Sequence, residues 1–103
     1  MPLPAFLQAY LPSYDIKKLD KASPGVAREV ITQVLNSGDD KAVAWVFENY
    51  TLKQIKEAVK HPQRGVWFKN SLNYWTKILK VDVDTNLYRK AIFNLNPFDE
   101  DYV

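Results

Sequence analysis

Helix-start signals recur along this chain and divide most of it into short segments with helical periodicity. They are Ser23 with Pro24, Asp39 or Asp40, Thr51 with Gln54, and Asp84 or Thr85. Oxygen-bearing side chains at such positions accept a hydrogen bond from an otherwise unpartnered amide, and proline at the first helical position loses no hydrogen bond. Apolar residues recur three or four positions apart after each start. The sequence therefore predicts an all-α fold, a compact single-core bundle of four to five helices.

The longest predicted helix is also the most apolar. Helices are predicted over residues 24–35, 52–60 and 66–80. A further helix of about ten residues follows Asp39 and Asp40, and a last one of two to three turns follows residue 85. More than half the circumference of helix 66–80 is apolar, with one row formed by Phe68, Leu72, Trp75 and Leu79. Only Thr51 separates the second and third predicted helices, a sharp junction found in helix-turn-helix units and in small bundles. We therefore expect the bundle to contain a helix-turn-helix-like unit.

The length of 103 residues is typical of one domain, so we expect a single helical domain over 1–103. Prolines alternate with Phe6, Tyr10 and Tyr14 near the start, which predicts an irregular arm over 1–14, followed by a helical turn at about 15–19. An acidic tail that frays is expected over 97–103.

Several classes of chemistry lack the side chains they need. The chain has no cysteine and one histidine, His61, so we expect no metal site. No carboxylates resemble an acid–base pair, and no glycine-rich phosphate loop or nucleophile elbow occurs, so we expect neither an enzyme nor a cofactor. No apolar run approaches the roughly 20 residues of a membrane span, and the first residues do not resemble a secretion signal. The sequence therefore predicts a cytoplasmic protein that does not bind membranes.

Basic residues concentrate in the middle of the chain. Residues 52–80 contain seven lysines and arginines and a single acidic residue, whereas the segments on either side carry a small acidic excess. The seven are Lys53, Lys56, Lys60, Arg64, Lys69, Lys77 and Lys80. We expect them to converge on one outward side, where they would favour an anionic partner. The alternative is that the lysines only solvate the outer faces of two helices.

Most aromatic side chains fall at helical spacing and are predicted to pack in the core rather than to stack on nucleotide bases. Trp67 is the expected exception, because it lies in the first turn of helix 66–80 beside Arg64 and Gly65. An exposed tryptophan there would be a contact hot spot for a protein partner or a wedge against nucleic acid.

A helix-turn-helix interpretation assigns specific roles to the polar residues. Helix 52–60 would lie across the phosphate backbone, and helix 66–80 would enter the major groove. Arg64 and Lys69 would reach guanine or phosphate. Asn70 and Asn73 would pair with adenine, and Lys77 would hold phosphate. The wide apolar arc of this helix leaves only a narrow polar strip, so DNA binding is the alternative hypothesis rather than the leading one.

A set of core positions and caps between about Tyr14 and Val81 resembles a known family. The matching residues are Leu19 with Asp20; Val30, Ile31, Val34 and Leu35 closing on Gly38 and Asp39; Trp45, Phe47 and Tyr50; Ile55 with Lys56; and Ser71 with Trp75. They resemble a small uncharacterised family of bacterial helical domains encoded beside AbiEii-type nucleotidyltransferases in toxin–antitoxin or abortive-infection modules. The resemblance covers about two thirds of the chain. Family members often open with Phe-Trp-Asp, where this chain has Ser13, Tyr14 and Asp15.

The resemblance implies an antitoxin-like protein that binds and restrains a nucleotidyltransferase toxin, whose carboxylate-lined active site suits a basic surface. The candidate residues for binding the partner or nucleic acid are Lys53, Lys56, Lys60, Arg64, Trp67, Lys69, Asn70, Asn73 and Lys77. A helix-turn-helix DNA-binding regulator is the alternative. A third hypothesis is a homo-oligomer that packs through Phe6, Tyr10 and Tyr14.

Overall fold

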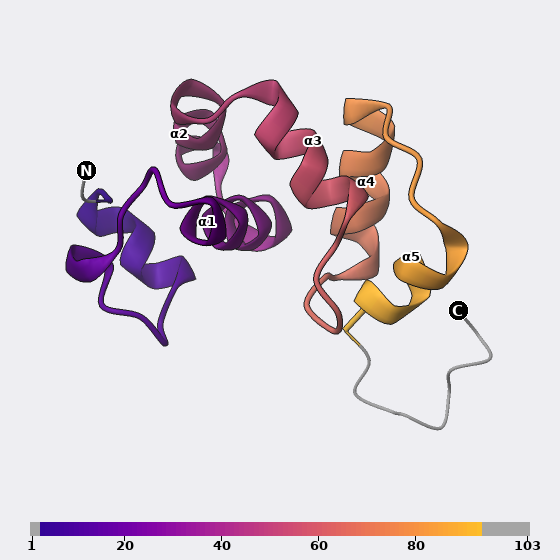
Figure 1. Ribbon diagram of the computed structural model, residues 1–103, viewed down its shortest axis with the longest axis horizontal. Helices are drawn as coiled ribbons and strands as arrows, with labels where there is room; N and C mark the ends of the chain where they lie inside the picture. The colour runs from indigo at the N-terminus through magenta and orange to yellow at the C-terminus, as the bar shows by residue number, and fades with distance from the viewer. Residues whose placement is uncertain (1–2, 94–103) are drawn as a thin grey trace.

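Helices form most of the chain that the structure describes, which is residues 3–93 of a computed structural model. Two 3₁₀ helices precede five α-helices (Figure 1): η1, Ala5–Tyr10; η2, Ile16–Lys18; α1, Pro24–Ser37; α2, Asp40–Asn49; α3, Leu52–Lys60; α4, Lys69–Leu79; and α5, Thr85–Ala91. Among the described residues, β pairing is limited to an isolated parallel bridge between Trp67 and Ile92. The predicted all-α, single-core fold is confirmed. The acidic tail predicted over 97–103 lies outside the described residues.

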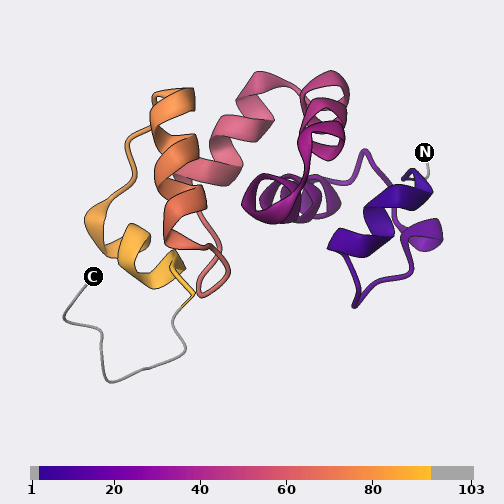
Figure 2. The same cartoon turned by 180° about the vertical axis from the view of Figure 1, so that it is seen from behind.

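Helix α1 is the central element of the fold. It contacts η1, α2, α3 and α4, and Figures 1 and 2 show it between the N-terminal segment and the pair formed by α3 and α4. Val30, Ile31 and Val34 are at most 1% exposed, as their helical spacing predicts. The helix begins at Pro24 as predicted, but Ser23 makes no side-chain capping hydrogen bond. Its start therefore depends on proline and on packing rather than on the Ser23 hydroxyl.

Side-chain caps set the beginnings of the later helices. The Asp39 carboxylate accepts a hydrogen bond from the Ala42 amide at 2.9 Å. The Thr51 hydroxyl accepts from the Gln54 amide at 3.1 Å, and the Gln54 side chain accepts in return from the Thr51 amide at 2.8 Å. Asp84 caps α5. Three of the four predicted caps are therefore confirmed, with Ser23 the exception, and each of the three contributes about 1 kcal/mol to stability.

The junctions on the two sides of α3 differ in length. Only Tyr50 and Thr51 separate α2 from α3, so the chain turns sharply there (Figure 1). Burial, and to a lesser degree the charge of Asp20, raises the pKa of Tyr50 to about 12, so its hydroxyl stays protonated and donates to the Lys21 carbonyl at 3.3 Å. Residues 61–68 join α3 to α4. The predicted helix-turn-helix pair of 52–60 and 66–80 therefore lacks the three- or four-residue turn typical of such units.

The side chain of Asn36, at the end of α1, holds the connection between α3 and α4. Its amide nitrogen donates to the Val66 carbonyl at 3.0 Å, and its amide oxygen accepts from the Phe68 amide at 2.8 Å. The Ser71 hydroxyl and the Trp75 indole N–H each donate, at 2.8 Å, to the last carbonyls of α1. These four hydrogen bonds fix α4 against α1.

Val66 lies in a turn and Trp67 and Phe68 are extended, so α4 begins at Lys69 and not at residue 66 as predicted. The Trp67 amide donates to the Ala91 carbonyl at 2.9 Å, and the Trp67 carbonyl accepts from the Phe93 amide at 2.7 Å. Trp67 is 0% exposed. The prediction of an exposed contact hot spot at Trp67 is therefore wrong, because Asn36 and residues 91–93 hold this segment extended and carry the indole into the core.

The N-terminal segment packs on the core instead of forming the irregular arm predicted over 1–14. Leu3, Leu7 and Leu11 are buried at intervals of four residues. Leu7 lies within η1, and Leu3 and Leu11 lie on either side of it. The Gln8 side chain donates to the Tyr14 carbonyl at 2.7 Å, which closes the turn that follows. Phe6 and Tyr10 are partly buried against the same core, while Tyr14 is 44% exposed. The helical turn predicted at about 15–19 is confirmed as η2.

Replacing Asn36 by alanine should lower the free energy of unfolding by about 2–3 kcal/mol, because it leaves the Val66 carbonyl and the Phe68 amide without their partner. The matched control is Asn73→Ala on the exposed surface of α4, where we expect a change below about 0.5 kcal/mol. Urea denaturation followed by tryptophan fluorescence measures both. Equal losses in the two variants would contradict the role given to Asn36.

Two glycine-to-alanine substitutions should change the stability of the protein in opposite directions. At Gly38 an added Cβ would lie 2.5 Å from the Val34 carbonyl oxygen, so we expect a loss of about 1–3 kcal/mol. At Gly25, inside the first turn of α1, nothing lies within 4 Å of the added atom. Alanine there should stabilise the protein by about 0.5–1 kcal/mol, because it loses less backbone freedom on folding. Thermal unfolding of the two variants measures both changes in stability. Changes of the same sign would refute this account.

Candidate functional site

Four lysines gather around a groove between α3 and the end of α4, which we call the lysine groove. It has a volume of about 530 Å³ and is lined by Leu52, Lys53, Lys56, Glu57, Lys60, Lys80, Val81 and Asp82. Lys53, Lys56 and Lys60 follow one another at intervals of three and four residues, which places them on one face of α3. Lys80 follows α4 in a left-handed conformation (φ 54°, ψ 50°), and Val81 lines the groove next to it.

The charge balance of the lysine groove favours a negatively charged occupant. Four ammonium groups face two carboxylates, those of Glu57 and Asp82. Within residues 3–93, none of the four lysine side chains takes part in a hydrogen bond or an ion pair. The Glu57 carboxylate instead lies 3.4 Å from His61 Nε2. Because unpaired ammonium groups produce a positive potential, the groove can attract and hold an anionic surface.

A second groove lies between α1 and α3, and we call it the α1–α3 groove. It has a volume of about 350 Å³ and is lined by Pro24, Ala27, Arg28, Ile31, Lys53, Gln54, Glu57, Ala58 and His61. Its floor is apolar, since Ala27, Ile31 and Ala58 are at most 4% exposed. Charged side chains form its rim. Lys53 and Glu57 line both grooves, so the two grooves adjoin across α3.

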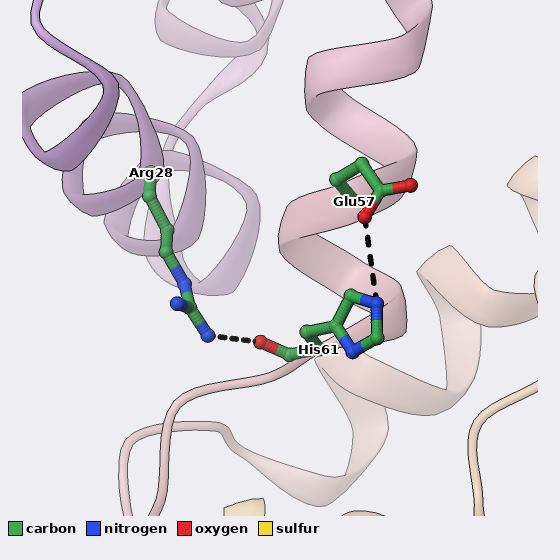
Figure 3. A network of polar contacts seen from close by, with 3 residues as sticks. All are labelled: Arg28, Glu57 and His61. Atoms are coloured by element: carbon green, nitrogen blue, oxygen red, sulfur yellow. Dashed lines mark hydrogen bonds and ion pairs between the residues drawn. The ribbon is translucent and has the colours of Figure 1, made fainter.

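Arg28 reaches from α1 toward the end of α3 (Figure 3). One guanidinium nitrogen donates to the backbone carbonyl of His61, the residue that follows α3, and the imidazole of His61 lies next to Glu57. This contact holds the guanidinium at the α1–α3 groove. Among the described residues its other N–H groups make no hydrogen bond. Sequence reasoning missed Arg28, because its partner lies 33 residues away and is a backbone atom that no side-chain pattern marks.

The other predicted binding residues lie away from the lysine groove. Arg64 precedes Gly65, whose amide donates to the Lys90 carbonyl, so Arg64 lies beside the end of α5. Lys69 opens α4, about 15 Å along the helix axis from its last residue. Neither groove includes Asn70, Asn73 or Lys77, which are exposed on α4. Of the seven cations expected to converge on one outward side, four line the lysine groove, and Arg64, Lys69 and Lys77 line neither groove.

Several apolar side chains at helical spacing are exposed, including Phe68 of the row predicted on helix 66–80, which is 50% exposed. Leu52, Tyr74 and Ile78 are between 53% and 55% exposed, and Leu52 lines the lysine groove. Tyr74 packs edge-on against Trp75, with ring centroids 5.0 Å apart. The exposure of Tyr74 and Ile78 could have been predicted from the wide apolar arc of helix 66–80, because a helix with neighbours on one side cannot bury more than half its circumference.

Comparisons with known proteins add no assignment to this geometry. No protein-family model matches the chain, and neither a curated protein nor a solved structure is significantly similar to it. Within the part of the chain that the structure describes, no helix is long and apolar enough to cross a membrane. The same residues contain no group of three or more His, Asp or Glu that could hold a metal ion. The two grooves are therefore the features from which we infer a function.

Proposed function

We propose that this chain is a non-enzymatic binding module that holds an acidic surface of a partner protein. The observation that supports the proposal is the lysine groove, whose four ammonium groups have no ion-pair partner in the described chain. The resemblance of residues 14–81 suggests a nucleotidyltransferase toxin as the partner. As an antitoxin-like protein in the cytoplasm, the chain would cover the acidic active site of that enzyme and restrain it.

Charge alone would not give a tight complex. Exposed ion pairs contribute about 0.2–1 kcal/mol each, and salt screens them over about 8–10 Å. The lysine groove also offers apolar surface, from Leu52 and Val81. Burying a leucine side chain that is about half exposed would add about 1 kcal/mol. In the proposed interface, the lysines therefore select an acidic partner, and apolar contacts keep that partner bound.

The alternative is DNA binding, and the observation that favours it is the exposed polar strip of α4. Asn70, Asn73 and Lys77 are exposed there. Two features oppose this alternative. The connection from α3 to α4 is longer than a helix-turn-helix turn, and the cations that share a groove line the lysine groove rather than the strip. DNA binding would also weaken steeply with salt, because phosphate contacts release counterions.

The contacts of the N-terminal segment do not favour the homo-oligomer hypothesis. Phe6 packs edge-on against Trp45, with ring centroids 6.5 Å apart, and the Tyr10 hydroxyl accepts from the Asp39 amide at 3.3 Å. Two of the three aromatic residues expected to contact another copy are therefore engaged within the chain.

Charge reversal in the lysine groove should weaken binding to the nucleotidyltransferase of a neighbouring reading frame. We expect the double variant Lys56→Glu, Lys60→Glu to raise Kd at least tenfold, because it replaces attraction by repulsion of the acidic partner. The matched control is Lys17→Glu with Lys18→Glu, which changes net charge equally on the exposed side chains of η2. Co-purification and isothermal titration measure both variants.

Unchanged binding of the groove variant, or an equal loss in the control, would contradict the proposal. Fluorescence anisotropy with random and operator-region duplexes, at low salt and at about 0.15 M salt, tests the alternative. Sequence-specific binding that disappears in the Asn70→Ala, Asn73→Ala variant would support the DNA-binding hypothesis instead.

A further inference from the structure

The two grooves together form a surface with one apolar part and one basic part. Lys53 and Glu57 line both, so an extended segment that crosses α3 would contact both grooves at once. We infer that the α1–α3 groove receives one apolar side chain of an acidic segment of the partner, while carboxylates on either side of it bind Arg28 and the lysine groove. This inference rests on the proposed function and specifies how the partner is held.

The α1–α3 groove suits a single aliphatic or aromatic side chain. Its volume of about 350 Å³ lies at the lower end of the range for small-ligand pockets, about 300–1,000 Å³. Two floor residues are alanines, Ala27 and Ala58, so their own side chains do not fill the space above them. Ile31 completes a floor without polar side-chain atoms. An apolar group is favoured there over a phosphate or a sugar, which would lose hydrogen bonds to water without replacement.

Arg28 supplies the carboxylate site at the edge of this groove (Figure 3). Its guanidinium has five N–H groups in a planar fork, and the His61 carbonyl engages one nitrogen. The remaining donors match the two oxygens of a carboxylate. Because the contact with His61 already restrains the side chain, the partner would not have to order it on binding. Lys53, on the rim shared with the lysine groove, adds a second positive charge.

The chemistry of the grooves favours a protein segment over nucleic acid. Neither groove is lined by a phenylalanine, tyrosine or tryptophan ring on which a base could stack, and the imidazole of His61 in the α1–α3 groove lies against the Glu57 carboxylate. Glu57 lines both grooves and would repel a continuous phosphate backbone, whereas a peptide can place an uncharged residue opposite it. Charge complementarity and the continuity of the grooves thus point to the same occupant, an acidic peptide segment with one apolar residue.

The first test uses the ¹⁵N-labelled full chain and two short synthetic peptides, in which Asp and Glu flank either one leucine or one serine. We expect the leucine peptide to bind about tenfold more tightly, because a buried leucine side chain contributes at least that factor. It should shift the amide resonances of Ala27, Ile31 and Ala58, while the serine peptide shifts only residues of the lysine groove. Equal affinities, or no shift of these three amides, would overturn the inference.

The second test addresses the carboxylate site. Arg28→Gln should weaken binding of the leucine peptide about tenfold, and Arg28→Lys should recover part of the loss, because lysine keeps the charge but not the fork. Arg89→Gln removes an exposed arginine from α5 and should leave Kd unchanged. The amide spectrum of each variant shows that the fold is retained. An equal loss for Arg28→Gln and Arg89→Gln would mean that only net charge matters, and the inference would fail.

The same variants separate this inference from the proposed function. Suppose that the Lys56→Glu, Lys60→Glu variant no longer binds the nucleotidyltransferase but the Arg28→Gln variant still binds it. The inference is then wrong and the proposed function stands. Suppose instead that the leucine peptide occupies the α1–α3 groove but the nucleotidyltransferase does not bind. The groove chemistry is then supported, and the proposed partner is wrong.

Discussion

The two hydrogen bonds of the Asn36 side chain determine how the second half of the chain meets the first. They hold residues 66–68 against the end of α1, and the extended conformation of Trp67 and Phe68 brings the indole of Trp67 into the core and lets the Trp67 backbone pair with residues 91–93. Because α4 can start only after this segment, its first residue is Lys69, and its last turn ends beside α3. The position of Lys80 in the lysine groove is thus a consequence of a contact at the other end of α4.

Local chemistry predicts most of the helices, because their boundaries depend on neighbours in sequence. Asp39, Thr51 and Asp84 bond amides two or three residues away, so the starts of three helices follow from the sequence alone. The non-helical segment 66–68 could not be predicted in this way. Its partners are Asn36, 30 and 32 residues away, and residues 91–93, while the local apolar spacing is that of a helix. Tertiary hydrogen bonds there override the local pattern.

The candidate site was predictable to the extent that it lies on one helix. Lys53, Lys56 and Lys60 share a face of α3 because of helical geometry, and their basic character is visible in the sequence. Lys80 was recognised as basic, but its place beside them depends on the path of the connection before α4. Lys69, also predicted to bind the partner, opens α4 about 15 Å along the helix axis from its last residue and does not line the lysine groove. Arg28 acts through a backbone carbonyl, which no side-chain motif reveals.

Helix α1 links the stability of the fold to the candidate site. Asn36 at its end fixes α4, while Ala27, Arg28 and Ile31 near its beginning line the α1–α3 groove. Both sides of that groove belong to helices that pack directly on each other, and the His61 carbonyl further restrains Arg28. A partner would therefore meet a groove whose shape is already set and would lose mainly its own conformational freedom. Exposed lysines can increase the rate of encounter, but the time a partner stays bound depends on apolar burial and restrained hydrogen bonds. For this reason the smaller and less charged of the two grooves is the one expected to control how long the complex lasts.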